Sequence, residues 1–330
     1  MPLMGCAFTR QSTGVMHMRI FIAGATGVVG RRVVPVLLDA GHRVTAVGRS
    51  AERRAQLEAR GAQAITVSLF DPEALARAVR GHDVVINLAT HIPPMSHLFL
   101  PGAWRENDRV RRDGSANLVD AAIAARAARF IQESFAPIYP DRGDRWIDES
   151  TPFSPVRYNR SVLDAEASTA RFTSGERVGV VLRFAGFYGP DAAQLSDMIR
   201  YVRKGRSPLP GPGDAYISSV SHDDAATAVI AALGAPAGAY NVADDEPVTH
   251  RAYVGAIACA LRVPAPTPFP RWVTRLLGSL GELMARSERI SNRRFRDTTG
   301  WAPAIPSARE GLPPCVDAFE DARRAHHAAA

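Results

Sequence analysis

A glycine-rich turn near the start of the chain limits the possible fold more than any other feature. Residues 18–30 read Met-Arg-Ile-Phe-Ile-Ala-Gly-Ala-Thr-Gly-Val-Val-Gly, with Gly24, Gly27 and Gly30 three positions apart. The apolar run before the turn is typical of a short buried strand, and apolar positions in residues 28–38 recur at helical spacing. Glycines in such a turn let the backbone approach a pyrophosphate, and the free N–H groups of the helix attract its charge. The pattern therefore predicts a dinucleotide site, whereas the plainer interpretation is a strand–helix turn that only tolerates glycine.

Strand and helix signals alternate through the first half of the chain. Strands are predicted at residues 20–23, 43–47, 64–67, 83–88, 130–132 and 178–182, and helices at residues 28–38, 72–80, 104–127 and 158–170. Strands separated by helices of this length form parallel sheets through right-handed crossovers, with helices on both faces. The sequence therefore predicts an α/β protein of the Rossmann type, with a doubly wound parallel sheet.

Three regions are expected along the chain. Residues 1–17 have little charge and no continuous apolar core and are expected to be a disordered leader, and residues 18–190 are expected to form the dinucleotide-binding domain. Beyond Gly189 and Pro190 the pattern changes to proline-punctuated helical segments, so residues 191–330 are expected to form mainly a smaller substrate-binding cap. Residues 214–246 are expected to return to the Rossmann domain, so the C-terminal cap is partly interleaved with it.

Composition disfavours several classes of function. Cys6, Cys259 and Cys315 lie far apart without metal-ligand spacing, so neither a disulfide framework nor a metal site is expected, and a reduced cytoplasmic setting fits best. No apolar stretch is long enough to span a bilayer, so no membrane partner is expected. The formal net charge of +7 raises nucleic acid as a partner, but arginines are spread over nearly every segment. A small-molecule substrate is expected instead.

The end of the second predicted strand indicates which dinucleotide is bound. In a fold of this type an acidic residue there bonds the ribose 2′-hydroxyl, whereas an arginine accommodates a 2′-phosphate. Here the strand is followed by Arg49 and Ser50, with Arg53 and Arg54 one helical turn further on. NADP is therefore favoured, with NAD possible, and the alternative is that Arg49 is only a solvated arginine.

Several motifs together resemble the extended short-chain dehydrogenase/reductases of the nucleotide-sugar epimerase and dehydratase type. They are the glycine turn, Asn87-Leu-Ala, Leu182-Arg-Phe-Ala-Gly-Phe-Tyr-Gly-Pro, Ser221-His-Asp-Asp-Ala and Thr299-Gly-Trp-Ala-Pro, and the resemblance spans about residues 18–310. It implies a nicotinamide cofactor across the strand ends and a substrate between sheet and cap. It also implies a possible homodimer, formed through residues 104–127 and 158–170.

The resemblance implies a set of cofactor contacts around the glycine turn and the next strand ends. They are Gly24, Ala25, Thr26, Gly27, Val28, Val29, Gly30, Arg49, Ser50, Leu69, Leu88, Ala89, Thr90, Asn107 and Tyr158.

The catalytic pattern of that family is broken in two places. Its members carry a serine or threonine after strand five and a tyrosine with a lysine four residues later, where helical spacing puts the ammonium beside the phenol and lowers the phenol pKa. Here Val162 stands four residues after Tyr158, where the lysine is expected, and Lys204 is the only lysine of the chain. Phe135 stands at the serine position and Ser134 one residue before it, although a loop distorted by Pro137 would return Ser134 to the site.

The surviving candidate catalytic residues are Tyr158, Ser134 and His91, the last in the loop after strand four. A lone loop histidine is more often structural. Ser221-His222-Asp223 is interpreted as a helix cap, because adjacent residues cannot form a hydrolase triad. The leading hypothesis is an NAD(P)-dependent oxidoreductase or epimerase-like protein acting on a carbonyl, alcohol or sugar-like molecule, with a diverged active site. The alternatives are a non-redox lyase, isomerase or cyclase on the same fold, and a non-catalytic NADP-binding sensor.

Overall fold

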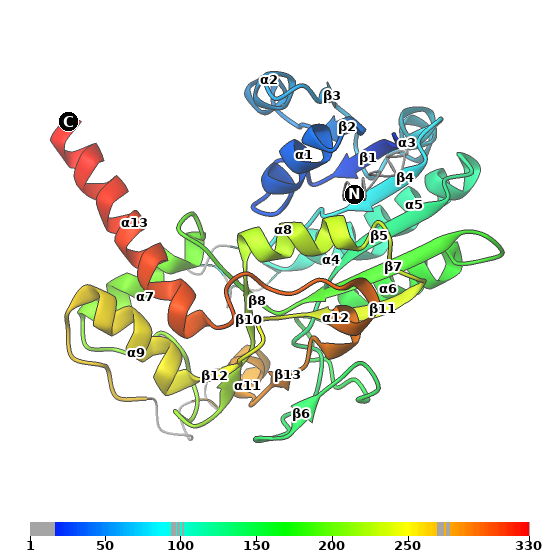
Figure 1. Ribbon diagram of the computed structural model, residues 1–330. Coiled ribbons are helices and arrows are strands. Elements are labelled where there is room, and N and C mark those ends of the chain that lie inside the picture. Colours follow the sequence, from blue (N-terminus) through cyan, green and yellow to red (C-terminus); the bar gives the residue numbers. More distant parts are fainter. Residues whose placement is uncertain are drawn as a thin grey trace, which may run out of the picture.

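The central feature of the computed structural model is a parallel sheet of seven strands (Figure 1). The structure describes residues 17–93, 97, 100, 102–268, 274 and 278–329, so residues 1–16 of the expected leader lie outside the described residues. The strand order is β11-β7-β5-β4-β1-β2-β3, and every neighbouring pair is parallel. The strands are β1 (Arg19–Ala23), β2 (Arg43–Val47), β3 (Gln63–Ile65), β4 (Val84–Asn87), β5 (Arg129–Phe135), β7 (Val178–Phe184) and β11 (Gly238–Val242). The predicted Rossmann-type α/β fold is confirmed.

Helices cover both faces of the sheet. One face carries α1 (Gly30–Asp39) and α8 (His222–Ala231), and the other carries α3 (Pro72–Val79), α5 (Ser115–Ala124) and α6 (Ser161–Phe172). The helix α2 (Ala51–Glu58) packs beside β3 at the sheet edge. Alternate strand residues feed two apolar cores, so that Ile20 and Ile22 lie on the α1 face whereas Phe21 lies on the α3 face. Burial on both faces explains the continuous apolar runs at residues 20–23 of β1 and 84–86 of β4.

Two predicted helices differ from the observed ones. The predicted helix 104–127 is divided into α4 (Arg105–Arg109), a π-helical segment η2 (Val110–Gly114) and α5. The predicted helix 158–170 begins at Ser161, and Tyr158 lies in the turn before it. Apolar periodicity of about 3.6 residues does not separate an α-helix from one π-turn, and π-turns are often found at functional sites. As predicted, Ser221 caps α8, where its Oγ accepts a hydrogen bond of 3.0 Å from the Asp224 N–H.

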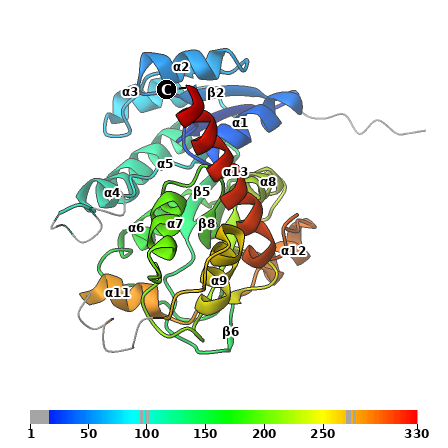
Figure 2. The ribbon, with the colours of Figure 1, turned by 90° about the vertical axis from the view of Figure 1, so that its left-hand side faces the viewer.

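The cap is built from three packed helices and three small two-stranded sheets. Figure 2 shows α7 (Ala193–Arg203), α9 (His250–Leu261) and α13 (Ala308–Ala329) in front of the sheet. Three strand pairs lie beside these helices: β8 (Gly186–Tyr188) with β10 (Ser219–Ser221), β9 (Tyr216–Ile217) with β12 (Val248–Thr249), and β6 (Trp146–Ile147) with β13 (Arg289–Ile290). In two of them, those of β6 and β8, a strand that precedes residue 191 pairs with one that follows it. The described part of this region also holds α11 (Gly278–Ala285) and α12 (Arg293–Thr299). Among the described residues, no helix is long and apolar enough to cross a membrane.

A buried carboxyl group follows the edge strand β11. Asp244 is 1% exposed, and its Oδ2 accepts a hydrogen bond of 3.1 Å from Ser219 Oγ. Burial raises the pKa of Asp244 to about 8, and the Ser219 hydrogen bond only partly opposes that rise. The folded protein therefore holds this carboxyl neutral over a range where the unfolded chain ionises it.

We expect Asp244→Asn to remove one source of pH-dependent stability. Because the folded pKa is raised, the wild-type contribution is complete below the ordinary value of 3.8 and is lost as the pH rises toward 8. Between pH ~5 and ~6.5, which lie inside those limits, the variant should gain on the order of 2 kcal/mol of unfolding free energy relative to wild type, at about 1.4 kcal/mol per pH unit. Urea unfolding at both pH values measures it. Asp39→Asn, on an exposed helix end, is the control, and a gain that is equal at both pH values would contradict this account.

Candidate active site

A cleft of about 470 Å³ opens where β1, β2, β3 and β4 end. Its walls come from the turn after β1, the segments after β2 and β3, the loop after β4, and α4 with the start of η2. The lining residues are Ala23, Gly24, Thr26, Gly27, Val47, Arg49, Arg53, Thr66, Val67, Ser68, Leu69, Phe70, Leu88, Ala89, Thr90, His91, Glu106 and Val110. In open α/β sheets, ligands bind at this carboxyl edge of the strands.

Two positions of the glycine turn, Gly24 and Gly30, have no room for a side chain. Gly24 has a φ of +80°, and a Cβ there would lie 2.4 Å from the carbonyl carbon of Leu88. A Cβ on Gly30 would lie 2.3 Å from the Gly24 oxygen, and the Gly27 N–H donates to that same oxygen at 3.0 Å. The turn is thus a bare backbone cradle at the N-terminus of α1, and the residues fit the phosphates of a dinucleotide.

The structure divides the residues predicted to contact a cofactor into two groups. Those that line the cleft are Gly24, Thr26, Gly27, Arg49, Leu69, Leu88, Ala89 and Thr90, and the predicted catalytic residue His91 lines it as well. Those outside its lining are Ala25, Val28, Val29, Gly30, Ser50, Asn107 and Tyr158. Ala25 and Val29 are core residues, and Ser50 Oγ caps α2 by accepting a hydrogen bond of 3.2 Å from the Arg53 N–H.

Two arginines mark the end of the cleft beside β2. Arg49 is exposed, and Arg53 Nη1 donates a hydrogen bond of 3.2 Å to Thr26 Oγ1 of the glycine turn. Arg54 donates instead to Thr66 Oγ1 at 2.7 Å. Residues 48–51 directly after β2 include no acidic side chain, and Glu52 does not line the cleft, so this end of the cleft is cationic. Arg53, Phe70 and Val110 line the cleft but were not among the predicted cofactor contacts. The position of Arg53 one helical turn after Arg49 was a signal in the sequence, whereas nothing in the sequence indicated Phe70 or Val110.

The loop after β4 rests on a buried amide. Asn107 is fully buried, and its Oδ1 accepts a hydrogen bond of 3.0 Å from the His91 N–H. Its Nδ2 has no hydrogen-bond partner among the described residues. Asn107 therefore holds the His91 loop from behind the cleft lining.

A buried ion pair lies in the same wall. Arg111 and Glu133 are 3% and 8% exposed, with Arg111 Nη2 at 3.3 Å from Glu133 Oε1. Arg111 Nε and Glu133 Oε2 have no hydrogen-bond partner in the described part of the chain. Burial raises the pKa of Glu133, and the Arg111 charge opposes that rise. Arg111 belongs to η2, whose first residue Val110 lines the cleft, so the pair joins β5 to this wall.

The remaining predicted catalytic residues do not converge in the cleft. Ser134 Oγ donates a hydrogen bond of 2.6 Å to Glu166 Oε1, and Glu166 is held by Arg183 Nη2 at 2.6 Å. Tyr158 is half-buried, with its ring centroid 5.7 Å from that of Trp104. The Ser134 hydroxyl is thus held in a buried hydrogen-bond network. The Tyr158 ring contacts Trp104, the residue before α4, and does not line the cleft.

A buried apolar residue occupies the position at which the family carries its lysine. Val162 is fully buried and belongs to an apolar cluster with Ala136, Ile138 and Tyr139. Lys204 caps the far end of α7 and is exposed. The described residues hold no group of three His, Cys, Asp or Glu side chains that could bind a metal.

Comparison with known proteins gives related reductases and related folds. A family model described as NAD(P)H-binding matches residues 24–172. The chain is 32% identical over 306 residues to the 3-diazoavenalumate denitrifying reductase of a Streptomyces species, covering 89% of this chain and 99% of that protein. It is 27% identical over 290 residues to the 2-alkyl-3-oxoalkanoate reductase of Shewanella oneidensis, covering 81% of this chain and 72% of that one.

Solved structures share the fold at lower identity. Human epimerase family protein SDR39U1 with NADPH superposes with a TM-score of 0.76 at 21% identity, over 91% of this chain and 99% of that one. MoeE5 in complex with UDP-glucuronic acid and NAD gives a TM-score of 0.75 at 21% identity, over 92% and 99%. One neighbour thus holds NADPH and the other NAD.

Proposed function

Because the chain belongs to the extended short-chain dehydrogenase/reductase superfamily, we propose that it is an NAD(P)H-dependent reductase of a small organic molecule. The observation that carries the proposal is the glycine cradle, in which a Cβ at Gly24 or Gly30 has no room. A turn kept bare at two positions, beside an open cleft of about 470 Å³, supports dinucleotide binding over simple tolerance of glycine.

The cleft residues have distinct roles toward the cofactor. When bound, a reduced nicotinamide supplies hydride to the substrate. The turn at Gly24 and Gly27 would hold the pyrophosphate, and Arg49 with Arg53 would hold a 2′-phosphate. The loop that carries Thr90 and His91 would border the nicotinamide end. The arginines favour NADP over NAD.

We expect the double variant Arg49→Gln/Arg53→Gln to lose NADPH affinity selectively. Because Arg49 and Arg53 are both exposed, we expect the two together to contribute about 1.5–3 kcal/mol, the range of one charge-assisted hydrogen bond, so NADPH binding should weaken roughly 10- to 100-fold. The affinity for NADH should change by less than about twofold, because NADH has no 2′-phosphate for these arginines to bind. Isothermal titration calorimetry with both dinucleotides measures this, and Arg43→Gln at the opposite, exposed end of β2 is the control. Equal losses for NADPH and NADH would contradict the assignment.

The acid–base groups limit the kind of substrate. Tyr158 can donate a hydrogen bond, but with Val162 in the core no cation lies one helical turn further on. Reduction of a carbonyl needs a proton as hydride arrives, and Tyr158 is the candidate donor. A diazonium group needs none, because R–N₂⁺ and hydride give R–H and N₂. The relative named a denitrifying reductase of 3-diazoavenalumate and the absent lysine both favour this second substrate class.

Tyr158→Phe separates the two substrate classes. With carbonyl substrates, we expect the rate of NADPH oxidation to fall by ~10²–10⁴. With an arenediazonium ion, the rate should change less than about threefold, after subtraction of the reaction without protein. Tyr201→Phe, an exposed tyrosine on α7, is the matched control. A wild type that binds NADPH tightly but oxidises it with neither class would contradict the reductase and favour the sensor hypothesis.

A further inference from the structure

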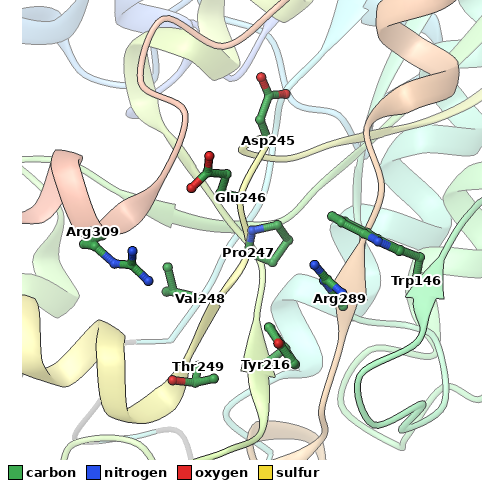
Figure 3. A pocket seen from close by; sticks show the side chains of 9 residues that line it. All are labelled: Trp146, Tyr216, Asp245, Glu246, Pro247, Val248, Thr249, Arg289 and Arg309. Atoms are coloured by element: carbon green, nitrogen blue, oxygen red, sulfur yellow. The ribbon is translucent and has the colours of Figure 1, made fainter.

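A second pocket of about 330 Å³ lies on the cap side of the sheet edge, and it shares no lining residue with the cofactor cleft (Figure 3). It lies between two small sheets, β6 with β13 and β9 with β12, beside the segment that follows β11 and the first turn of α13. Its lining residues are Trp146, Tyr216, Asp245, Glu246, Pro247, Val248, Thr249, Arg289 and Arg309.

The walls of this pocket are held together by hydrogen bonds from backbone N–H groups. The Tyr216 oxygen accepts from the Glu288 N–H at 3.0 Å, and the Ile290 N–H donates to Ser218 Oγ at 2.8 Å, so β9 and β13 are tied together. On the other side, the Glu246 N–H donates to the Pro306 oxygen at 2.9 Å. The pocket is therefore shaped before any ligand arrives.

One guanidinium group is held in place by aromatic rings. Arg289 pairs across the strands with Trp146, and its guanidinium carbon lies 4.1 Å from the centroid of the Trp146 ring and 5.1 Å from that of Tyr216. Its Nε is buried without a hydrogen-bond partner among the described residues, and Nη1 makes only a 3.4 Å bond to the Asp144 oxygen. Stacking fixes the guanidinium plane but leaves in-plane donors for a ligand.

The other charges of the pocket do not neutralise Arg289. Asp245 is occupied, because its Oδ1 accepts from Arg296 Nη1 at 2.6 Å and from Asn292 Nδ2 at 2.8 Å. Arg309 is exposed on the first turn of α13 and makes no ion pair with any residue that the structure describes. Figure 3 shows Arg309 and Arg289 extending over Val248 and Pro247 from opposite walls, with Glu246 above. Two guanidinium groups and one carboxylate thus remain open.

We infer that this pocket binds a small organic anion. Its acidic groups meet Arg289 and Arg309 on the two walls, and each guanidinium offers the paired donors that a carboxylate or phosphate accepts. Glu246 accepts a hydrogen bond from a hydroxyl or ammonium group of the same ligand, which limits the ligand to anions that carry a donor. The site is separate from the reductase site and does not depend on its chemistry.

The test is calorimetry with L-malate and with inorganic phosphate, each run with and without a saturating mixture of NADPH and NADH. We expect at least one of the two probes to bind, and to bind equally with and without the dinucleotides, because the dinucleotides occupy only the other cleft. Arg289→Gln and Arg309→Gln should each weaken that binding at least tenfold, and Arg80→Gln, an exposed arginine after α3, should leave it unchanged. Glu246→Gln should weaken malate and strengthen phosphate, which separates recognition of the donor from simple charge.

Three results would overturn the inference. They are no binding of either probe, binding that survives both arginine substitutions, and binding that disappears when the dinucleotides are added. Thermal melting shows whether each variant is folded. If Arg289→Gln does not fold, Arg309→Gln still tests the inference, because Arg309 is exposed and its substitution should not affect folding. Dinucleotide affinity of the same variants should be unchanged, so failure here is distinct from failure of the reductase proposal.

Discussion

Gly24→Ala should abolish useful dinucleotide binding while the protein stays folded. The new Cβ would lie 2.4 Å from the Leu88 carbonyl carbon and 2.6 Å from the Ala89 nitrogen, which real Cβ atoms do not tolerate, and the residue would keep a φ of +80°. Relief requires the turn to move away from the end of β4, which widens the cradle. We expect NADPH affinity to fall roughly 100-fold or more, corresponding to about 3 kcal/mol.

Gly61→Ala is the control for this variant. Gly61 has a φ of +92°, but a Cβ there meets nothing within 4 Å. It therefore carries the backbone strain alone, about 1–2 kcal/mol of stability, and should leave dinucleotide affinity unchanged. If both alanine variants lower the affinity equally, the close approach at Gly24 is not what forms the site.

Arg111→Met should be among the most destabilising single substitutions in the Rossmann domain. It leaves Glu133 buried without its counter-charge, and removal of one member of a buried pair typically costs about 3–5 kcal/mol. Because burial raises the pKa of Glu133 and Arg111 opposes that rise, the variant should hold the carboxyl neutral. Its stability should therefore be lost as the pH rises and recover as the pH falls.

The double variant Arg111→Met/Glu133→Leu completes a thermodynamic cycle. It should regain most of the lost free energy of unfolding, because no buried charge remains. Arg112→Met, next in the chain and paired on the surface with Asp113, should cost no more than about 1 kcal/mol. Urea unfolding of wild type, Arg111→Met, Glu133→Leu and the double variant measures the coupling, with Arg112→Met as the control. A double variant as unstable as Arg111→Met alone would show that the pair is not coupled.

The fold could be predicted because its determinants are local. Apolar runs such as residues 20–23 and the glycine turn each act over a few neighbouring residues, and they alternate with helices of suitable length. The strand segment at residues 130–132 proved longer, Arg129–Phe135, since its polar residues Gln132 and Ser134 are buried in hydrogen bonds. A buried strand is hard to recognise from sequence when it contains polar residues whose hydrogen-bond partners lie far away in the chain.

Much of the candidate site could not be predicted, since it depends on contacts between distant segments. The Arg111–Glu133 pair needs both the π-turn and the end of β5, and neither residue type signals it alone. Ser134 was taken from its place beside the family serine position, but Glu166, 32 residues later, decides where its hydroxyl points. The Arg289–Trp146 stack depends on pairing of β6 with β13, which carries no local signal.

The central claim is that this chain transfers hydride from a bound nicotinamide without the lysine of its family. The direct measurement is a single turnover with NADPH that carries deuterium in place of both hydrogens at the nicotinamide C4, using carbonyl substrates and an arenediazonium ion, followed by mass spectrometry of the product. We expect deuterium in the product of the wild type and no deuterated product when Gly24→Ala replaces it. Product without deuterium, or product formed by protein free of dinucleotide, would contradict it.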